Sequence, residues 1–147
     1  MKMLIPPVLF ILCLALMVLL NRYWPWVVWS HAPWKFLGAL PILTGLALGS
    51  SGWRRFRRRG TTIHAFSEAG TMVTDNIYRR TRNPMYLGLV LDLAGVWVLL
   101  GGLSPLLPLL VFVVAVDRWV IRWEEAALSR KFGPEYERYK SRTRRWI

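Results

Sequence analysis

The segment of residues 60–86 contains the first set of groups with which this chain could bind a ligand. The candidates are Gly70-Thr71-Met72-Val73, then Tyr78, and finally Asn83-Pro84-Met85-Tyr86. Pro84 has no amide proton and suits the first turn of a helix, so the amides that follow it stay available to a ligand. Asn83 precedes it at the capping position. The alternative is that these residues only begin a helix, which Tyr86 anchors at a membrane interface.

A second set of charged residues follows later in the chain, at Arg118, Arg122, Glu124 and Glu125. On one continuous helix, Arg118, Arg122 and Glu125 are spaced i, i+4 and i+7 and share a face. Two guanidinium groups and two carboxylates would then meet in one place. The alternative is a solvated helix end, whose salt bridges contribute about 0 to 1 kcal/mol each.

The remaining ionisable residues add two candidates and exclude one kind of site. Asp92 and Asp117 lie inside or at the end of apolar runs, where a carboxylate is costly and is therefore a functional candidate. The alternative for Asp117 is pairing with a nearby arginine. His31 and His64 have no matching ligands at a suitable spacing, so no metal site is expected.

Long apolar runs predict the elements that hold these residues. The chain is 54% hydrophobic, and runs of about 18 uncharged residues form helices of roughly 27 Å, close to the thickness of a bilayer core. Gly101, Gly102 and Pro105 interrupt the longest run and predict a helical hairpin. We therefore expect an all-α, polytopic membrane protein with a single domain over residues 1–147 and a cytoplasmic C-terminal helical segment. The predicted spans are about 3–21, 34–53, 85–103 and 105–122.

Smaller features qualify this expectation. A secretory signal is the alternative for the first run, because Lys2 precedes it. Gly45 and Gly49 form a small-x-x-x-small pair that lets another helix approach closely. The alternative is that they only reflect the abundance of glycine in membrane helices. Cys13 cannot form an internal disulfide, because it is the one cysteine, and we expect it to pack as a small apolar side chain.

The distribution of the positive charge predicts the orientation. The net charge is +12, and four spans would place every Lys and Arg except Arg22 and Lys35 on the side of both termini. The positive-inside rule makes this side cytoplasmic. Basic clusters beside spans meet anionic lipid headgroups, so membrane lipids are the expected partners and nucleic acid is not. The basic tail from Arg138 to Ile147 is expected to lie on the lipid surface as an anchor.

The two sets of residues together resemble one enzyme family. The resemblance is to the isoprenylcysteine carboxyl methyltransferases. It rests on Met72-Val73-Thr74, Tyr78, Arg82-Asn83-Pro84-Met85-Tyr86-Leu87-Gly88 and Glu124-Glu125-x-x-Leu128-x-x-x-Phe132-Gly133-x-x-Tyr136-x-x-Tyr139. The related phospholipid N-methyltransferases share the glutamate pair. The resemblance covers roughly residues 60–147 and flanks the predicted hairpin.

This resemblance implies a bacterial-type, inner-membrane enzyme that transfers a methyl group from S-adenosylmethionine to a lipophilic or lipid-borne acceptor. Its cofactor-binding segments would be residues 60–86 and 118–147, both cytoplasmic. The cofactor contacts carried over from the family are Gly70, Thr71, Met72, Val73, Tyr78, Asn83, Pro84, Met85, Tyr86, Glu124 and Glu125.

Two positions depart from the eukaryotic pattern. Asn83 stands where those relatives have histidine, which removes a titratable imidazole but keeps hydrogen bonding. Val120 stands where they have a substrate-contacting arginine, and Arg118 or Arg122 is expected to hold an anionic part of the acceptor instead. The acceptor atom stays open among carboxylate, amine and thiol. The alternatives to a methyltransferase are a non-catalytic scaffold or lipid-binding protein and a nicotinamide-dependent membrane reductase.

Overall fold

The described part of the chain is helical, as expected. The computed structural model describes residues 5–29, 31–58, 72, 74 and 76–147, and within these it contains helices and two isolated bridges but no strand. In chain order, the elements are α1 (Ile5–Tyr23), η2 (Trp34–Gly38), α2 (Ala39–Arg58), η3 (Asn76–Arg79), α4 (Pro84–Leu100), α5 (Leu106–Ala115), η4 (Val116–Ile121), α6 (Arg122–Phe132) and α7 (Pro134–Arg142).

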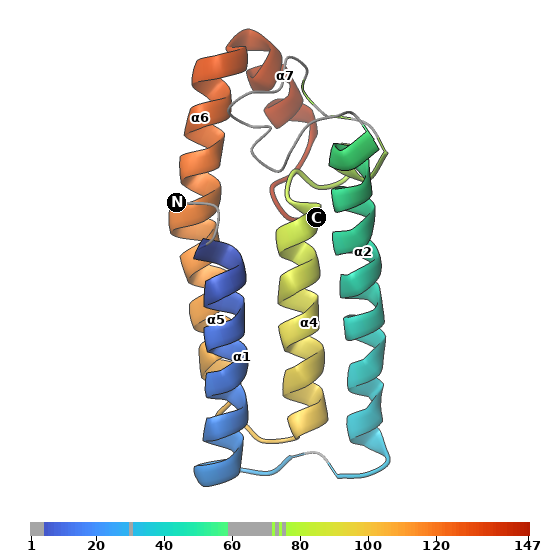
Figure 1. Ribbon diagram of the computed structural model, residues 1–147, viewed down its shortest axis with the longest axis vertical. Coiled ribbons are helices and arrows are strands. Elements are labelled where there is room, and N and C mark those ends of the chain that lie inside the picture. The colour runs from blue at the N-terminus through green and yellow to red at the C-terminus, as the bar shows by residue number, and fades with distance from the viewer. Residues whose placement is uncertain (1–4, 30, 59–71, 73, 75) are drawn as a thin grey trace.

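The long helices run side by side along the long axis of the molecule (Figure 1). In this view α4 lies between α2 and the pair of α1 and α5. The elements α5, η4 and α6 follow one another as a single rod that extends past the bundle, and α7 folds back beside α6. The N-terminal ends of α1 and α4 therefore face the rod near the same end of the bundle.

The predicted hairpin has its turn where glycine and proline place it. Helix α4 ends at Leu100, and Gly101 follows with a φ of 72°, a left-handed conformation that glycine adopts without strain. Helix α5 begins after Pro105. Two helices, Ile5–Tyr23 and Trp34–Arg54, are long and apolar enough to cross a membrane, and Pro84–Leu100 is apolar but shorter. Four spans therefore stay a prediction.

Glycines bring α2 and α4 into close contact. A Cβ atom at Gly38 would overlap the carbonyl oxygen of Gly95, and one at Gly45 would overlap the backbone of Gly88. A Cβ atom at Gly49 would meet nothing within 4 Å. Of the expected pair, only Gly45 needs to be glycine for α2 to pack against α4. Another position with this need is Gly38, seven residues earlier, at the end of η2.

The core lies between α1, α4 and the rod. Met17, Leu93 and Phe112 are completely buried there, and Cys13 packs beside them as a free thiol. The outer faces of α1 and α2 instead expose large apolar side chains, such as Ile11 at 62% and Leu43 at 64%. An apolar outer surface of this kind suits contact with lipid.

Candidate active site

A π-helical turn changes which side chains the rod presents. Residues Val116–Ile121 form a π-helix, whose wider turn alters the register between α5 and α6. The face expected from α-helical spacing is therefore not formed. The side chain of Arg118 is 62% exposed and Arg122 is exposed, whereas that of Glu125 is only 12% exposed. Neither arginine lines a pocket described below.

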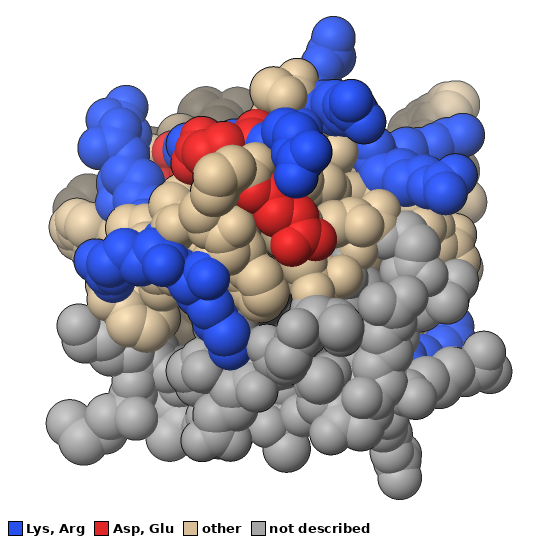
Figure 2. Space-filling view, turned by 90° about the horizontal axis from the view of Figure 1, so that it is seen from above, with Lys and Arg blue, Asp and Glu red and all other residues tan. Residues whose placement is uncertain are grey.

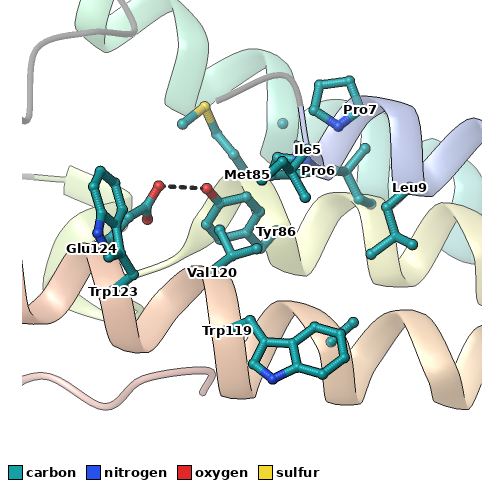
Figure 3. Close-up of a pocket in the computed structure, with 13 residues that line it drawn as sticks. Ile5, Pro6, Pro7, Leu9, Met85, Tyr86, Trp119, Val120, Trp123 and Glu124 are labelled. Atoms are coloured by element: carbon teal, nitrogen blue, oxygen red, sulfur yellow. Dashed lines mark hydrogen bonds between the residues drawn. The ribbon is translucent and has the colours of Figure 1, made fainter. Parts of the chain in front are cut away.

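Tyr86 and Glu124 meet across two helices (Figure 3). The Tyr86 hydroxyl at the start of α4 donates a 2.6 Å hydrogen bond to Oε1 of Glu124 at the start of α6. Burial raises the pKa of Glu124 to about 7, the hydrogen bond from Tyr86 opposes this rise, and the neighbouring charge of Glu125 adds to it. Glu124 is therefore a carboxyl group that changes its charge near neutral pH.

An apolar cavity of about 530 Å³ lies on one side of this hydrogen bond. Figure 3 shows Tyr86 and Val120 on facing helices, with Pro6 and Leu9 of α1 near the other end of the cavity. The cavity is lined by Ile5, Pro6, Pro7, Leu9, Gly49, Met85, Tyr86, Leu89, Ala115, Trp119, Val120, Trp123 and Glu124. Its size is that of a site for a small molecule or one hydrocarbon chain.

A polar pocket lies on the other side of Glu124. It consists of two small hollows, of about 30 Å³ and about 20 Å³, which share Tyr78, Arg82, Asn83 and Glu124. The larger hollow adds Met72, Glu125, Leu128, Tyr136 and Tyr139, and the smaller one adds Pro84, Met85 and Tyr86. Glu124 lines both hollows and the apolar cavity, so it separates a polar from an apolar space.

Pro84 begins α4 as expected, but Asn83 has a different role from a cap. Asn83 occupies the N-cap position without a capping hydrogen bond from its side chain. Its Nδ2 instead donates to the carbonyl oxygen of Arg145 at 3.0 Å. The first helical bond of α4 runs from the Leu87 amide to the Asn83 carbonyl, so the amides of Met85 and Tyr86 have no partner within the helix.

The C-terminal strap, residues 143–146, contacts two residues that line the polar pocket, Asn83 and Glu125. Arg145 donates to Glu125 from Nη2 at 2.6 Å and from Nε at 3.2 Å, and its Nη1 lies 3.3 Å from Asp117. These carboxylates raise the pKa of Arg145, with the Glu125 hydrogen bonds as the largest cause. Trp146 Nε1 also donates to Asp117 at 2.9 Å. Arg145 and Trp146 therefore bind within the protein, and contact of the tail with lipid stays a prediction.

Tyrosines from α7 close the polar pocket from above. The Tyr139 hydroxyl donates to the Tyr78 carbonyl oxygen at 2.7 Å. Burial is the main reason that the pKa of Tyr136 rises to about 12, and it also raises the pKa of Tyr78 and of Tyr139. All three phenols are therefore neutral hydrogen-bonding groups at physiological pH.

The structure brings most of the expected residues together and adds others. The expected residues that line the polar pocket are Met72, Tyr78, Asn83, Pro84, Met85, Tyr86, Glu124 and Glu125. The other three, Gly70, Thr71 and Val73, lie outside the described residues. The sequence reasoning missed Arg82, Arg145 and Trp146 as site residues. Arg82 stands within the motif that was recognised, but no spacing rule points to Arg145.

Charge is arranged unevenly on this end of the molecule. Figure 2 shows acidic side chains near the middle of the face, with Lys and Arg side chains around them. Positive groups around these acidic side chains would attract anionic headgroups to this end of the molecule.

Comparison with known proteins identifies the family. The sequence model of the family described as phospholipid methyltransferase matches residues 34–135, which include both sets of candidate residues. The chain belongs to this phospholipid methyltransferase family. It is also 40% identical over 63 residues to a Haemophilus influenzae protein described as uncharacterized, a match that covers 43% of this chain and all of that relative. No solved structure matches the chain. Family membership implies a methyltransferase for substrates of the membrane-lipid type and agrees with the resemblance above.

Proposed function

We propose that the protein is an S-adenosylmethionine-dependent methyltransferase that acts on a lipid-borne acceptor at the cytoplasmic membrane face. One observation carries the proposal: the hydrogen-bonded pair of Tyr86 and Glu124 separates a polar pocket from an apolar cavity. A water-soluble methyl donor and a lipid acceptor need such adjoining spaces, because their reacting atoms must meet while their bodies stay in different surroundings.

The chemistry of the polar pocket fits the donor. The carboxylate of Glu124 suits an ammonium group or a cationic sulfonium, and Glu125, which binds Arg82 and Arg145, borders the same pocket. The amides of Met85 and Tyr86 suit acceptor atoms of the donor. The hollows total far less than the roughly 300 Å³ of the smallest common ligand sites. Binding of the whole donor therefore requires the polar pocket to widen. Residues 60–86 and 118–147 supply the proposed cofactor-binding segments.

Glu124 is the group best placed to handle a proton. S-adenosylmethionine supplies an electrophilic methyl group when bound. An amine acceptor must lose its proton before it can attack, and a carboxylate with a pKa of about 7 accepts that proton near neutral pH. This property favours an amine acceptor over a carboxylate, which needs no base. Tyr86 holds the Glu124 oxygen toward the boundary where the acceptor would arrive.

The apolar cavity is the proposed site for the hydrocarbon part of the acceptor. Trp119 and Trp123 line it and are 75% and 45% exposed, so the cavity opens at the surface of the rod. In a membrane, this opening admits a chain sideways from the lipid. Arg118 and Arg122 stay the predicted contacts for an anionic headgroup, because both are exposed on the same rod.

The proposed orientation places four helices across the bacterial inner membrane. The spans are α1, η2 with α2, α4, and α5 with η4, which puts both termini in the cytoplasm. The basic residues around the site then face the anionic inner leaflet.

Two measurements test the proposed function. Isothermal titration of the purified protein in detergent should give saturable binding of S-adenosylmethionine, and absence of binding would contradict the proposal. Incubation of native membranes with a labelled methyl donor should then label a lipid fraction. Glu124→Gln should reduce that labelling at least tenfold. Glu137→Gln, which removes an exposed carboxylate from α7, is the matched control and should label normally.

A further inference from the structure

Arg82 is a buried cation whose hydrogen bonds are incomplete. Its side chain is only 10% exposed, and Nη2 lies 3.2 Å from Oε1 of Glu125. Its Nε and Nη1 atoms are buried without a hydrogen-bond partner. A guanidinium carries five N–H donors, and a charged group held away from water is costly unless these donors are satisfied. Among the described residues, no acceptor therefore reaches the Nε and Nη1 atoms of Arg82.

The carboxylates around the polar pocket are already engaged by other residues. Glu125 accepts two hydrogen bonds from Arg145 besides its ion pair with Arg82. Asp117 accepts from Arg145 and from Trp146. Tyr86 occupies one oxygen of Glu124, whose raised pKa also reduces its negative charge near pH 7. A ligand that enters the polar pocket can supply the missing acceptor.

The position of Arg82 indicates which ligand supplies the acceptor. Arg82 lines both hollows of the polar pocket but not the apolar cavity, and Glu124 lies between these spaces. A phosphate on a lipid acceptor enters from the apolar side. An anionic group of the water-soluble donor lies on the polar side, where Arg82 is.

We infer that Arg82 binds the carboxylate of the methionine part of the methyl donor. This inference rests on the proposed function and adds the direction in which the donor lies. With its carboxylate at Arg82, the donor has its sulfur toward Glu124, the residue that borders all three spaces. A charge-assisted hydrogen bond in a buried pocket would also satisfy the Arg82 donors that have no partner in the ligand-free protein.

Two ligands that differ in this carboxylate test the inference. S-adenosylhomocysteine carries the amino acid group, and 5′-methylthioadenosine lacks it. Dissociation constants for both should be measured on the full-length protein in detergent, for the wild type, Arg82→Gln, Arg82→Lys and Arg80→Gln. Arg80 is the matched control, because it is an exposed arginine two positions away.

Arg82→Gln should weaken S-adenosylhomocysteine binding about 10- to 100-fold and change 5′-methylthioadenosine binding less than about twofold. Arg82→Lys should recover part of the loss, because it keeps the charge, and Arg80→Gln should bind both ligands normally. An equal loss for both ligands would mean general damage to the pocket and would overturn the inference.

Two further outcomes separate this inference from the proposed function. Unchanged S-adenosylhomocysteine binding by Arg82→Gln, together with a raised KM for a phospholipid acceptor, would assign Arg82 to the lipid phosphate and overturn the inference alone. Failure of the wild-type protein to bind any of the donor-related ligands would instead overturn the proposed function and this inference with it.

Discussion

The Tyr86 hydroxyl and the Glu124 carboxylate, 38 positions apart in the chain, lie 2.6 Å from each other at the boundary between the polar pocket and the apolar cavity. This contact connects the first turn of α4 to the first turn of α6. It also links a group that titrates near neutral pH to a hydrogen-bond donor that favours its charged form.

Tyr86→Phe should shift the pH dependence of donor binding upward. A cationic sulfonium favours the Glu124 carboxylate, so affinity for S-adenosylmethionine should increase as pH rises through about 7. Loss of the Tyr86 hydroxyl raises the pKa of Glu124 further, so the increase should occur at higher pH. Isothermal titration between pH 5.5 and 9 measures the midpoint. Tyr23→Phe, at a 79% exposed tyrosine, should leave it unchanged. A downward shift for Tyr86→Phe would contradict the assigned role.

Glu124→Gln should stabilise the protein more at pH 8 than at pH 5. Burial raises the pKa of Glu124 from 4.5 to about 7 in the folded protein. The contribution of this group to stability is therefore fully present below the unfolded pKa and is lost as the pH rises through about 7. Gln cannot ionise, so the thermal midpoint of the variant relative to wild type should rise by on the order of 5 °C between these pH values.

Glu137→Gln is the control for this measurement, because the pKa of Glu137 is shifted in the opposite direction from that of Glu124. Hydrogen bonds from Ser129 and Lys140 lower the pKa of this exposed carboxylate. Its contribution is therefore present above the unfolded pKa and is lost only in more acidic solution. The difference between Glu137→Gln and wild type should stay constant from pH 5 to pH 8. Parallel curves for wild type and Glu124→Gln would show that Glu124 has an ordinary pKa.

Arg145→Ala should weaken donor binding about tenfold and lower the thermal midpoint by several degrees. The change releases Glu125 and Asp117 from their shared cation and loosens the strap whose carbonyl oxygen holds Asn83. Arg145→Lys should recover part of the affinity. Arg144→Ala removes the neighbouring exposed side chain and should have little effect. Equal behaviour of Arg144→Ala and Arg145→Ala would support a general effect of surface charge instead.

Gly45→Ala should destabilise the protein by about 1–3 kcal/mol, whereas Gly49→Ala should be neutral or slightly stabilising. The added methyl group at Gly45 overlaps the backbone of Gly88 and the Asp92 side chain, and at Gly49 it meets nothing within 4 Å. Thermal denaturation in detergent compares the two variants. Similar losses for both would indicate that α2 does not pack on α4 in this register.

Local patterns in the sequence were sufficient for the helices and for many pocket residues. Pro84 marks the start of α4 and Gly101 its end, because ring constraint and a left-handed φ act within a few residues. The motif around Asn83 and the pair Glu124 and Glu125 located residues that line the polar pocket. Whether four helices cross a membrane stays a prediction, since two of the described helices meet the length and hydropathy needed.

Contacts between distant segments required the folded chain. Regular helical spacing did not indicate the π-helical turn at Val116–Ile121, nor that Arg118 and Arg122 are exposed. Arg145 reaches Glu125 because the strap runs back beside α4, and no local pattern encodes such a return. Hydropathy and turn chemistry act over a few residues, whereas ion pairs and cavities depend on where separate helices meet. For this reason the residue types were readable along the chain, but their partners were not.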